Sequence, residues 1–543
     1  MGNETRANSV THAYAGWRFL PALLLMLVAC SDREAGVVNH PPAAPRSGGE
    51  AIVLLSADFA GAWPAGLDPA TNTNGGGNIS QMNAIYGGLF QLAADEDGSN
   101  PKLSGVLATG YDVTDEGRTI VIHLRQGVTF SDGTPFNAEA VKFSIERNLD
   151  SGCTCSPTTW PWDKQNRVTT PDEHTVALHF TTPYAPVMNG FPVSSINWPV
   201  SPTALRQMGE DKFKITPVGA GPFRVVSNQL SSRLVLERNP RYWQPGRPYL
   251  DRLVFQSIGG EQAAYQAVLA GDANVYEGMQ SIPLILQAQQ SKLLTVTPQP
   301  AVSPWLVQMN MTSAPFNDKR AREALYYATN TEAIRTGLFK NWYPVSQSFT
   351  GPGGLFHRQG VPGYRTHDLQ KAKALVAELG GLHVKLGTLR SFVSEQVVTA
   401  LQSQWKEAGI DVTLETYDIG TLIRRFQAAD WQALLQITGS YDPEAGSGLR
   451  ARFKSNSLLS GVRDPQLDDL LSRGTETTDP AKREEIYAHA AKYISDQAYA
   501  PFLVAQAPVQ LARGIQGPGL TTKIPPILLN TSVLWQDVSL ASQ

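Results

Sequence analysis

The amino-acid sequence predicts an α/β protein of at least two domains, and three observations lead to that prediction. Once an N-terminal leader is set aside, about 510 residues remain, far more than one hydrophobic core organises. Residues 50–305 consist mostly of strand-like runs separated by Gly and Pro turns. From about residue 306, helical patterns alternate with short strands, which is typical of a sheet covered by helices.

Residues 1–29 have the features of a secretory signal peptide. A basic start with Arg6 and Arg18 precedes an apolar run from Phe19 to Ala29. That run is shorter than the roughly 17–25 residues with which a helix spans a bilayer, and it fits the core of a signal peptide instead. We therefore expect the chain to be exported.

The four residues Leu27-Val28-Ala29-Cys30 resemble a bacterial lipobox. In a lipobox the peptidase cuts before the cysteine, whose thiol carries a diacylglycerol, so Cys30 is the predicted lipidation site. An ordinary signal peptide with an incidental cysteine at the cut is the alternative. Pro, Gly and small polar residues then predict a lipidated, flexible tether over residues 30–49. No later run is long and apolar enough to span a membrane, so we expect a soluble body held by its anchor.

Within the strand-rich part, one segment predicts a strand, a turn and a capped helix in succession. Apolar residues at every second position of 119–124 indicate a half-buried strand. The turn at 132–135 reads Asp-Gly-Thr-Pro and reverses the chain, and Asn137 is placed to cap a helix. The same alternation predicts further strands around 176–180 and 234–236.

Four helices are predicted in the second part, from apolar residues at helical spacing behind a cap or before a glycine stop. They begin near Asn317 or Asp318, at Asp368, at 394 and at Asp479-Pro480. The third helix, 394–408, stops at Gly409, and an alternating strand at 410–414 follows it.

Net charge and cysteine content exclude some partners and sites. The formal net charge is -3 and no basic cluster occurs, which argues against nucleic acid as a partner. Besides Cys30, the only cysteines are Cys153 and Cys155, in a Cys-Thr-Cys loop. A disulfide between them could form but would be strained and readily reduced. Free thiols and a metal site are the alternatives, and because a lone CxC without a nearby histidine makes a poor metal site, we expect no metal.

Several separated motifs carry a family resemblance. Residues 124–144 read LRQGVTFSDGTPFNAEAVKFS. The other matching segments are GLDPA at 66–70, AIYGGLF at 84–90, GAGPF at 219–223 and NPRYW at 239–243. Together they resemble the family 5 extracytoplasmic solute-binding proteins of ABC importers, which serve dipeptides, oligopeptides, nickel chelates and related solutes.

The resemblance implies a two-lobed periplasmic-binding-protein clamshell of type II, similar to cluster C, with two crossover strands between its α/β lobes. By matching, the crossovers lie near 303–310 and 501–505. Lobe I then takes residues 50–305 and is completed by 502–543, and lobe II takes 306–501.

The implied function is that of a substrate-binding lipoprotein, which captures di- or oligopeptides between its lobes and delivers them to a membrane permease. Its partners would be the peptide or small-molecule ligand, the ABC permease and ATPase subunits, and a membrane through the lipid anchor. We expect a monomer without cofactor in the cell envelope, with its body in the periplasm or on the outer surface. No HExxH, GxSxG, P-loop or GxGxxG string occurs, so we do not expect an enzyme.

Two kinds of alternative stay open. The importer could carry a non-peptide solute, such as a nickel chelate, a glutathione-like compound, an opine or an oligosaccharide. The chain could also be a surface chaperone or adhesin that retains the clamshell.

The resemblance places one group of ligand contacts around an Asp-Pro pair in lobe II, just after the acid that binds a peptide α-amine. The four residues before Asp442-Pro443 are Thr438, Gly439, Ser440 and Tyr441. No carboxylate stands among them. Either Asp442 or Glu444 therefore reaches the amine, or the ligand has no amine at that point. Asp442 could equally be a structural turn residue.

A second group of contacts follows a lobe II strand, at Arg390, Ser391 and Phe392. Arg390 is a candidate for a ligand carboxylate, because a guanidinium binds a carboxylate through two parallel hydrogen bonds. A solvated loop arginine is the alternative.

Lobe I supplies the remaining candidates. Trp160 and Trp162 flank a proline and could stack on a ligand, although packing in the core is at least as good an interpretation. Gly77 and Asn78 match the place where the family's first lobe touches the ligand backbone, and the alternative is a flexible turn.

Overall fold

The computed structural model describes residues 45–57, 63–72, 78–93, 102–151, 160–439, 441–445, 448–521 and 533–541. Several predictions lie outside these residues and stay predictions: the signal peptide, Cys30, most of the tether, Gly77, the pair Cys153 and Cys155, and Ser440. The described residues belong to the compact unit Ala43–Gln543.

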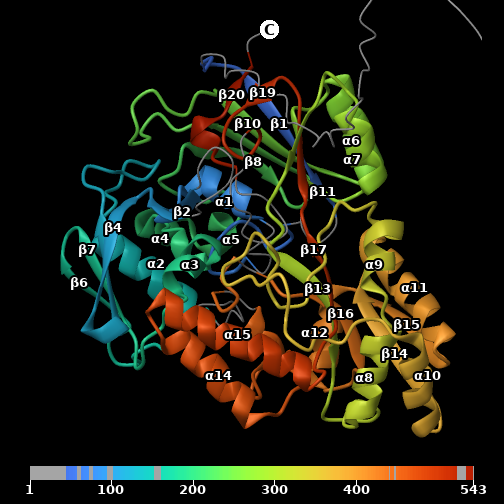
Figure 1. Ribbon diagram of the computed structural model, residues 1–543. Helices are drawn as coiled ribbons and strands as arrows, with labels where there is room; N and C mark the ends of the chain where they lie inside the picture. The colour runs from blue at the N-terminus through green and yellow to red at the C-terminus, as the bar shows by residue number, and fades with distance from the viewer. Residues whose placement is uncertain are drawn as a thin grey trace, which may run out of the picture. The chain divides into compact units, whose positions relative to one another are not determined.

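A seven-stranded mixed sheet organises the part that we call lobe I (Figure 1). Its order is β12 (Thr295–Pro298), β18 (Val509–Ala512), β11 (Val275–Met279), β1 (Glu50–Ser56), β10 (Arg252–Ile258), β9 (Arg233–Arg238) and β8 (Phe223–Gln229). The central strand β1 runs parallel to β10 and β11, and the other pairs are antiparallel. Strand β9 contains the alternating residues around 234–236 that predicted a strand.

Helices cover both faces of this sheet. Leu54 packs in one core cluster with α6 (Glu261–Ala270) and α7 (Ile282–Gln289). Its neighbours Val53 and Leu55 point the opposite way and pack in another cluster with α1 (Ile79–Tyr86). This arrangement follows from the period of two along a strand.

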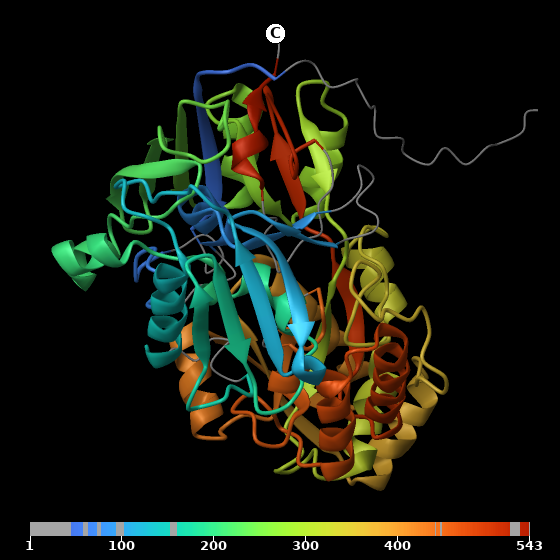
Figure 2. The same cartoon turned by 90° about the vertical axis from the view of Figure 1, so that its left-hand side faces the viewer.

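Lobe I also contains a four-stranded antiparallel sheet, drawn in cyan to teal in Figure 2. Its order is β4 (Ala108–Thr114), β5 (Thr119–Leu124), β7 (Thr175–His179) and β6 (Val168–Asp172). The predicted half-buried strand 119–124 is confirmed as β5, whose alternate residues are buried. The predicted cap is confirmed too, because the Asn137 side chain accepts a hydrogen bond from the Ala140 amide at the start of α2 (Ala138–Asp150).

A five-stranded sheet organises lobe II (Figure 1). Its order is β15 (Ile410–Tyr417), β14 (Leu382–Leu389), β16 (Ala433–Ile437), β13 (Ser303–Met309) and β17 (Phe502–Gln506). The covering helices are α8 (Lys319–Ala328), α10 (Leu369–Glu378), α11 (Phe392–Glu407), α12 (Ile419–Gln427), α14 (Pro465–Glu476) and α15 (Pro480–Asp496). The predicted caps Asp318, Asp368 and Asp479 are confirmed, and the helix expected at 394 begins two residues earlier.

The shorter elements complete the two lobes. They are the strands β2 (Phe90–Ala93), β3 (Lys102–Gly105), β19 (Ile515–Gln516) and β20 (Ser539–Leu540), and the helices α3 (Val187–Gly190), α4 (Pro202–Met208), α5 (Glu210–Phe213), α9 (Thr331–Ala333) and α13 (Leu449–Phe453). Within the described ranges, no helix is both long and apolar enough to cross a bilayer.

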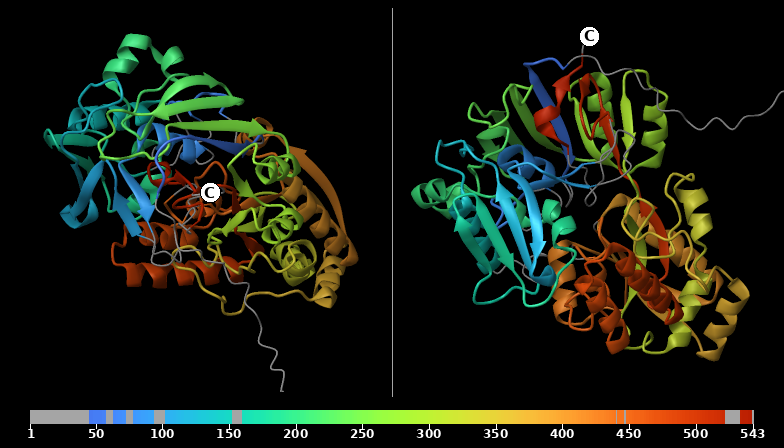
Figure 3. Two further views of the ribbon diagram at one scale, coloured as in Figure 1. Left: turned by 90° about the horizontal axis from the view of Figure 1, so that it is seen from above. Right: turned by 60° about the vertical axis from the view of Figure 1, so that its left-hand side comes forward.

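Two neighbouring strands connect the lobes (Figure 3). The chain leaves the seven-stranded sheet after β12 and enters the five-stranded sheet as β13; it returns from β17 to β18. Strands β13 and β17 pair with each other in antiparallel orientation. They occupy the positions expected for the two crossovers, near 303–310 and 501–505.

The lobe I motifs that carry the family resemblance have structural roles. Gly219 and Gly221 lie so close to the end of α1 that an added Cβ would come within 2.4 Å of the Ile85 carbonyl oxygen at Gly219 and 2.6 Å of the Ile85 carbonyl carbon at Gly221. The Asn239 side chain then donates to the Gly221 carbonyl at 2.9 Å. The GAGPF and NPRYW motifs therefore hold the end of α1 against β8.

The GLDPA motif serves a buried ion pair. Asp68 is fully buried, and both of its carboxylate oxygens accept hydrogen bonds from the Arg147 guanidinium on α2, each at 2.7 Å. The pair connects the segment before α1 to α2, the helix that packs on the four-stranded sheet. A bidentate pair of this kind is geometrically specific.

Replacing Asp68 by Asn should lower the free energy of unfolding by about 3–5 kcal/mol, because the mostly buried Arg147 cation loses its main partner. Urea unfolding followed by tryptophan fluorescence measures this change. The control is Glu237→Gln, which breaks a pair with Arg224 whose side chains are 42% and 45% exposed, and it should cost less than about 1 kcal/mol. Equal effects of the two substitutions would contradict a structural role for the Asp68 pair.

Candidate functional site

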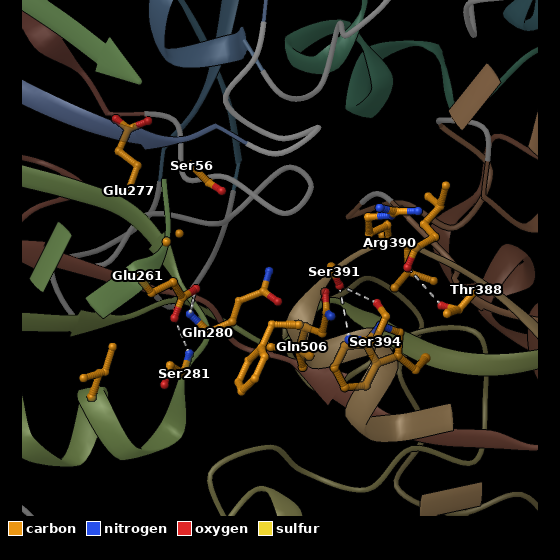
Figure 4. Close-up of a pocket in the computed structure, with 18 of the residues that line it drawn as sticks. Ser56, Glu261, Glu277, Gln280, Ser281, Thr388, Arg390, Ser391, Ser394 and Gln506 are labelled. Carbon is orange, nitrogen blue, oxygen red and sulfur yellow. Dashed lines mark hydrogen bonds between the residues drawn. The ribbon is translucent and has the colours of Figure 1, made fainter. Parts of the chain in front are cut away.

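A cavity of about 580 Å³ lies where the carboxyl ends of strands from both lobes face each other (Figure 4). From lobe I it is lined by the ends of β1 and β11 and the starts of α6 and α7, and from lobe II by the ends of β14 and β16, the start of α11, Trp305 and Gln506. Open α/β sheets bind ligands at the carboxyl ends of their strands. The volume falls in the range of roughly 300–1,000 Å³ that is usual for sites of small ligands.

The segment from Arg390 to Ser394 forms the lobe II rim of this cavity. The Arg390 amide donates to the Tyr417 carbonyl at 2.9 Å, which ends the parallel pairing of β14 with β15. The Ser391 hydroxyl accepts from the Ser394 amide and caps α11. These bonds fix the backbone and leave the two flanking side chains in the solvent, with Phe392 69% exposed.

Arg390 is a free cation at the cavity. Its side chain is exposed, and among the described residues its guanidinium makes no hydrogen bond and no ion pair. No other arginine, lysine or histidine is found among the described lining residues. The guanidinium is therefore free to bind an anionic group of a solute.

The opposite wall carries a buried carboxyl group, Glu277 on β11. The Trp535 indole donates to the Ser80 hydroxyl, which in turn donates to Glu277 Oε1, both at 2.7 Å. Glu277 Oε2 has no hydrogen-bond partner among the described residues, and the residue is only 4% exposed. Burial raises the pKa of the Glu277 carboxyl to about 8, against a smaller lowering by the Ser80 hydrogen bond.

The other acid on this wall is fixed by the backbone. Glu261 at the start of α6 accepts from the Gln280 amide at 2.9 Å and from the Ser281 amide at 2.6 Å. Figure 4 shows Glu261, Glu277 and Ser56 on one side of the cavity and Arg390 on the other.

Two amide side chains add unused hydrogen-bonding atoms. Gln436 at the end of β16 and Gln506 at the end of β17 line the cavity. Among the described residues, Gln436 Nε2 has no acceptor and Gln506 Oε1 has no donor, although both side chains are buried. Buried polar atoms that lack partners are uncommon, so a bound solute is a natural partner for these two.

Trp160 and Trp162 lie elsewhere. They stack on each other with ring centroids 5.9 Å apart and contact Tyr184 and Phe180 in the core beneath the four-stranded sheet. Asn78 is buried at the start of α1. None of the three is among the residues that line the cavity.

Asp442 and its neighbours form a contact between the lobes. The Asp442 carboxylate is fully buried and accepts from the Arg483 guanidinium at 2.6 and 3.0 Å and from the lobe I residue Asn189 at 3.2 Å. The carbonyls of Gly439 and Tyr441 accept from the Ser303 hydroxyl and the Leu355 amide. Asp442 is thus already neutralised by a side chain of its own protein.

Glu444 belongs to the same contact. Its carbonyl accepts from the Tyr184 hydroxyl of lobe I, and the Arg450 guanidinium lies 3.9 Å from its carboxyl oxygen. Burial raises the pKa of Glu444 to about 8. Neither Asp442 nor Glu444 lines the cavity described above.

The structure therefore brings part of the predicted site into one place. Arg390, Ser391 and Phe392 are at the cavity, whereas Thr438, Gly439, Tyr441 and Asp442 lie at the end of β16 and in the lobe contact. The sequence analysis missed Glu277 and the two glutamines. A signal existed for Glu277, because it is a lone carboxylate in the otherwise uncharged strand Val275–Met279.

Comparison with known proteins identifies the fold. The model of the bacterial extracellular solute-binding proteins, family 5 (middle region), matches residues 102–458. The glutathione-binding protein GsiB of Shigella flexneri is 25% identical over 445 residues, which cover 76% of this chain and 81% of that protein.

Solved structures agree with the family match. The periplasmic binding protein DppA of Helicobacter pylori, in complex with the peptide STSA, superposes with a TM-score of 0.77 at 21% identity and covers 92% of this chain and 99% of that one. The dipeptide-binding protein of Pseudoalteromonas sp. SM9913, in complex with Met-Leu, gives a TM-score of 0.73 at 19% identity, with coverage of 88% and 99%. At these identities the structural matches show a shared two-lobed fold, which confirms the fold class predicted from the sequence.

The Glu277 carboxyl makes stability depend on pH. It stays protonated in the folded chain up to about pH 8, whereas an unfolded glutamate ionises near about 4.3. The stability that the neutral carboxyl contributes is complete below the unfolded pKa and is lost as the pH rises through the folded pKa. The glutamine in Glu277→Gln does not titrate. The free energy of unfolding of this variant, minus that of the unchanged protein, should therefore increase by up to about 1.4 kcal/mol per pH unit between the unfolded and the folded pKa.

Urea unfolding at a series of pH values measures this difference. Glu237→Gln makes the same chemical change in a half-exposed ion pair of β9 and is the control for the substitution itself. A gap between Glu277→Gln and the unchanged protein that stays constant with pH would show that the buried carboxyl has an ordinary pKa.

Proposed function

Because the chain belongs to the family 5 bacterial extracellular solute-binding proteins of ABC importers, we propose that it captures short peptides in the cavity between its lobes and delivers them to a membrane permease. The observation that carries the peptide assignment is the exposed Arg390 guanidinium at the cavity rim, which has no ion-pair partner among the described residues. It offers a carboxylate two parallel charge-assisted hydrogen bonds.

The rest of the cavity suits a peptide backbone. A peptide presents both amide donors and carbonyl acceptors along its length. The unused Gln436 Nε2 donor and Gln506 Oε1 acceptor provide one partner of each kind. The exposed Phe392 ring and the buried Trp305 ring add apolar surface for side chains.

The arrangement of the lining residues also explains how binding signals to a permease. A solute that touches both Arg390 on lobe II and the β11 wall on lobe I makes its full set of contacts only when the lobes are closed. Its differential affinity for that form shifts the equilibrium towards closure. A permease that recognises the closed form then distinguishes loaded protein from empty protein.

Of three similar proteins, two support this assignment and one defines its rival. The Helicobacter and Pseudoalteromonas proteins of the same fold were solved with peptides, and the Shigella relative is named for glutathione. Glutathione also carries free carboxylates, so it is an outcome that the binding experiment must separate from ordinary peptides.

The predicted lipid anchor is part of the proposal. We infer that Cys30 is acylated after cleavage of residues 1–29, so that the monomeric body works in the cell envelope beside its permease and ATPase. Mass spectrometry of the mature N-terminus should find a diacylglycerol on Cys30, and Cys30→Ala should lose it. A mature protein whose N-terminal residue is an unmodified Cys30 would contradict acylation at this residue.

Native mass spectrometry is the direct test of the solute. The exported protein, purified without refolding, should release masses with amino-acid spacings when it is mildly denatured. Release of a single compound without such spacings would overturn the peptide assignment, and a mass equal to that of glutathione would establish the rival.

Arg390→Ala should weaken binding of alanine di- to pentapeptides by about 10- to 100-fold, the loss expected for hydrogen bonds to a charged group. Peptides amidated at the carboxyl end should bind the variant and the unchanged protein about equally. Titration calorimetry measures both sets of affinities.

The matched control is Arg358→Ala, which removes an arginine of the same lobe that pairs with Glu484 outside the cavity and should leave binding unchanged. Equal losses for free and amidated peptides on Arg390→Ala would show that this arginine does not read the carboxylate.

A further inference from the structure

Glu277 is the one acid on the lobe I wall with a carboxyl oxygen that accepts no hydrogen bond from a described residue. Its partner Ser80 is an uncharged hydroxyl, and its Oε2 atom has no partner among the described residues. The charged and titratable residues that share the cavity with it are Glu261, Tyr276 and Arg390. Glu261 is bound to backbone amides, and Arg390 lies on the opposite side of the cavity in Figure 4.

A carboxyl group in this position has an energetic cost that the protein alone does not offset. Burial without a cationic partner disfavours the ionised form. The hydrogen bonds from Trp535 to Ser80 and from Ser80 to Oε1 nevertheless fix the orientation of the Glu277 carboxyl group. Orientation of a buried polar group with one free oxygen is what a binding site for a hydrogen-bond donor requires.

The chain also lacks the acid that its motif position would supply. Asp442 is held by Arg483 and Asn189 in the lobe contact. Glu444 is fully buried and does not line the cavity, so neither acid offers a cation of the solute a partner there. Glu277 is the remaining acid at the cavity with a free acceptor among the described residues.

We propose that Glu277 binds a cationic group of the solute, an ammonium or a guanidinium, so that the site selects solutes with a cation towards lobe I and a carboxylate towards Arg390. This assignment rests on the proposed function, since it names the chemistry of the same solute. Ser80 is then a positioning residue, which acts on the solute through Glu277.

Proton release is the signature of this arrangement. In the empty site the raised pKa keeps Glu277 largely protonated at pH 7. A cation that comes into contact with the carboxyl favours its ionised form. The proton on the carboxyl passes to solvent as the ion pair forms, so binding should release close to one proton at pH 7.

The experiment compares alanine di- to pentapeptides with their N-acetylated counterparts, which lack the cation. Acetylation should weaken binding to the unchanged protein by at least about tenfold and should change binding to Glu277→Gln little. Calorimetry in buffers of different ionisation enthalpy should show proton release for the unchanged protein and its loss in Glu277→Gln. Glu237→Gln is the control and should behave like the unchanged protein in both respects.

Ser80→Ala separates recognition from packing. Loss of its hydroxyl removes the bond that orients Oε1, so the preference for a free amine should fall while N-acetylated peptides bind as before. Melting curves of all variants show whether each is folded.

The outcomes distinguish this assignment from the proposed function. If free and acetylated peptides bind the unchanged protein equally and no proton is released, the role of Glu277 is overturned while peptide binding stands. If no peptide binds, the proposed function fails, and argininamide, which has cations but no carboxylate, tests Glu277 alone. A rise in melting temperature with argininamide that Glu277→Gln lacks would support the cation site, and equal behaviour of the two proteins would overturn it.

Discussion

The antiparallel pairing of β13 with β17 is the constraint on which the rest of the structure depends. The chain leaves lobe I once and returns to it once, and both passages belong to the five-stranded sheet of lobe II. Because the two strands are hydrogen-bonded to each other, the lobes are attached along one line. The carboxyl ends of β1 and β11 can therefore face those of β14 and β16, and the cavity forms between them.

Buried carboxylates of the framework differ from the ionisable groups at the cavity in whether they have a charged partner. In the framework, two buried carboxylates are paired within the protein, Asp68 with Arg147 and Asp442 with Arg483. At the cavity, Arg390 and Glu277 have no charged partner among the described residues. Ionisable groups in a cleft without a charged partner are typical of functional sites. Buried pairs such as Asp68–Arg147 serve stability instead, because loss of one partner is strongly destabilising. This contrast supports the proposal that Arg390 and Glu277 bind the solute, whereas the two paired carboxylates stabilise the fold.

Local features were predictable from the sequence, and long-range side-chain partners were not. The caps Asn137, Asp318, Asp368 and Asp479 are confirmed because a cap depends on residues within one turn. Arg390 was predicted as a ligand contact from the family resemblance, which places a contact segment after a lobe II strand, and it lies at the cavity. The burial of Trp160 and Trp162 depends on Phe180 and Tyr184 of another segment, and the partner of Asp442 is a helix residue far along the chain. Periodicity carries no information about such partners.

If the solute binds as we propose, the difference in exposure between Arg390 and Glu277 would give its capture an order in time. Arg390 lies in the solvent, so its field reaches about a Debye length into the surroundings and draws in an anionic end before contact. Glu277 is buried and largely neutral at pH 7, so it exerts no comparable long-range attraction. The carboxylate of the solute would therefore bind Arg390 first. The complex would become long-lived only when the cationic end of the solute displaces the proton from Glu277. Salt would then slow association, whereas alkalinity would act chiefly on how long the solute stays.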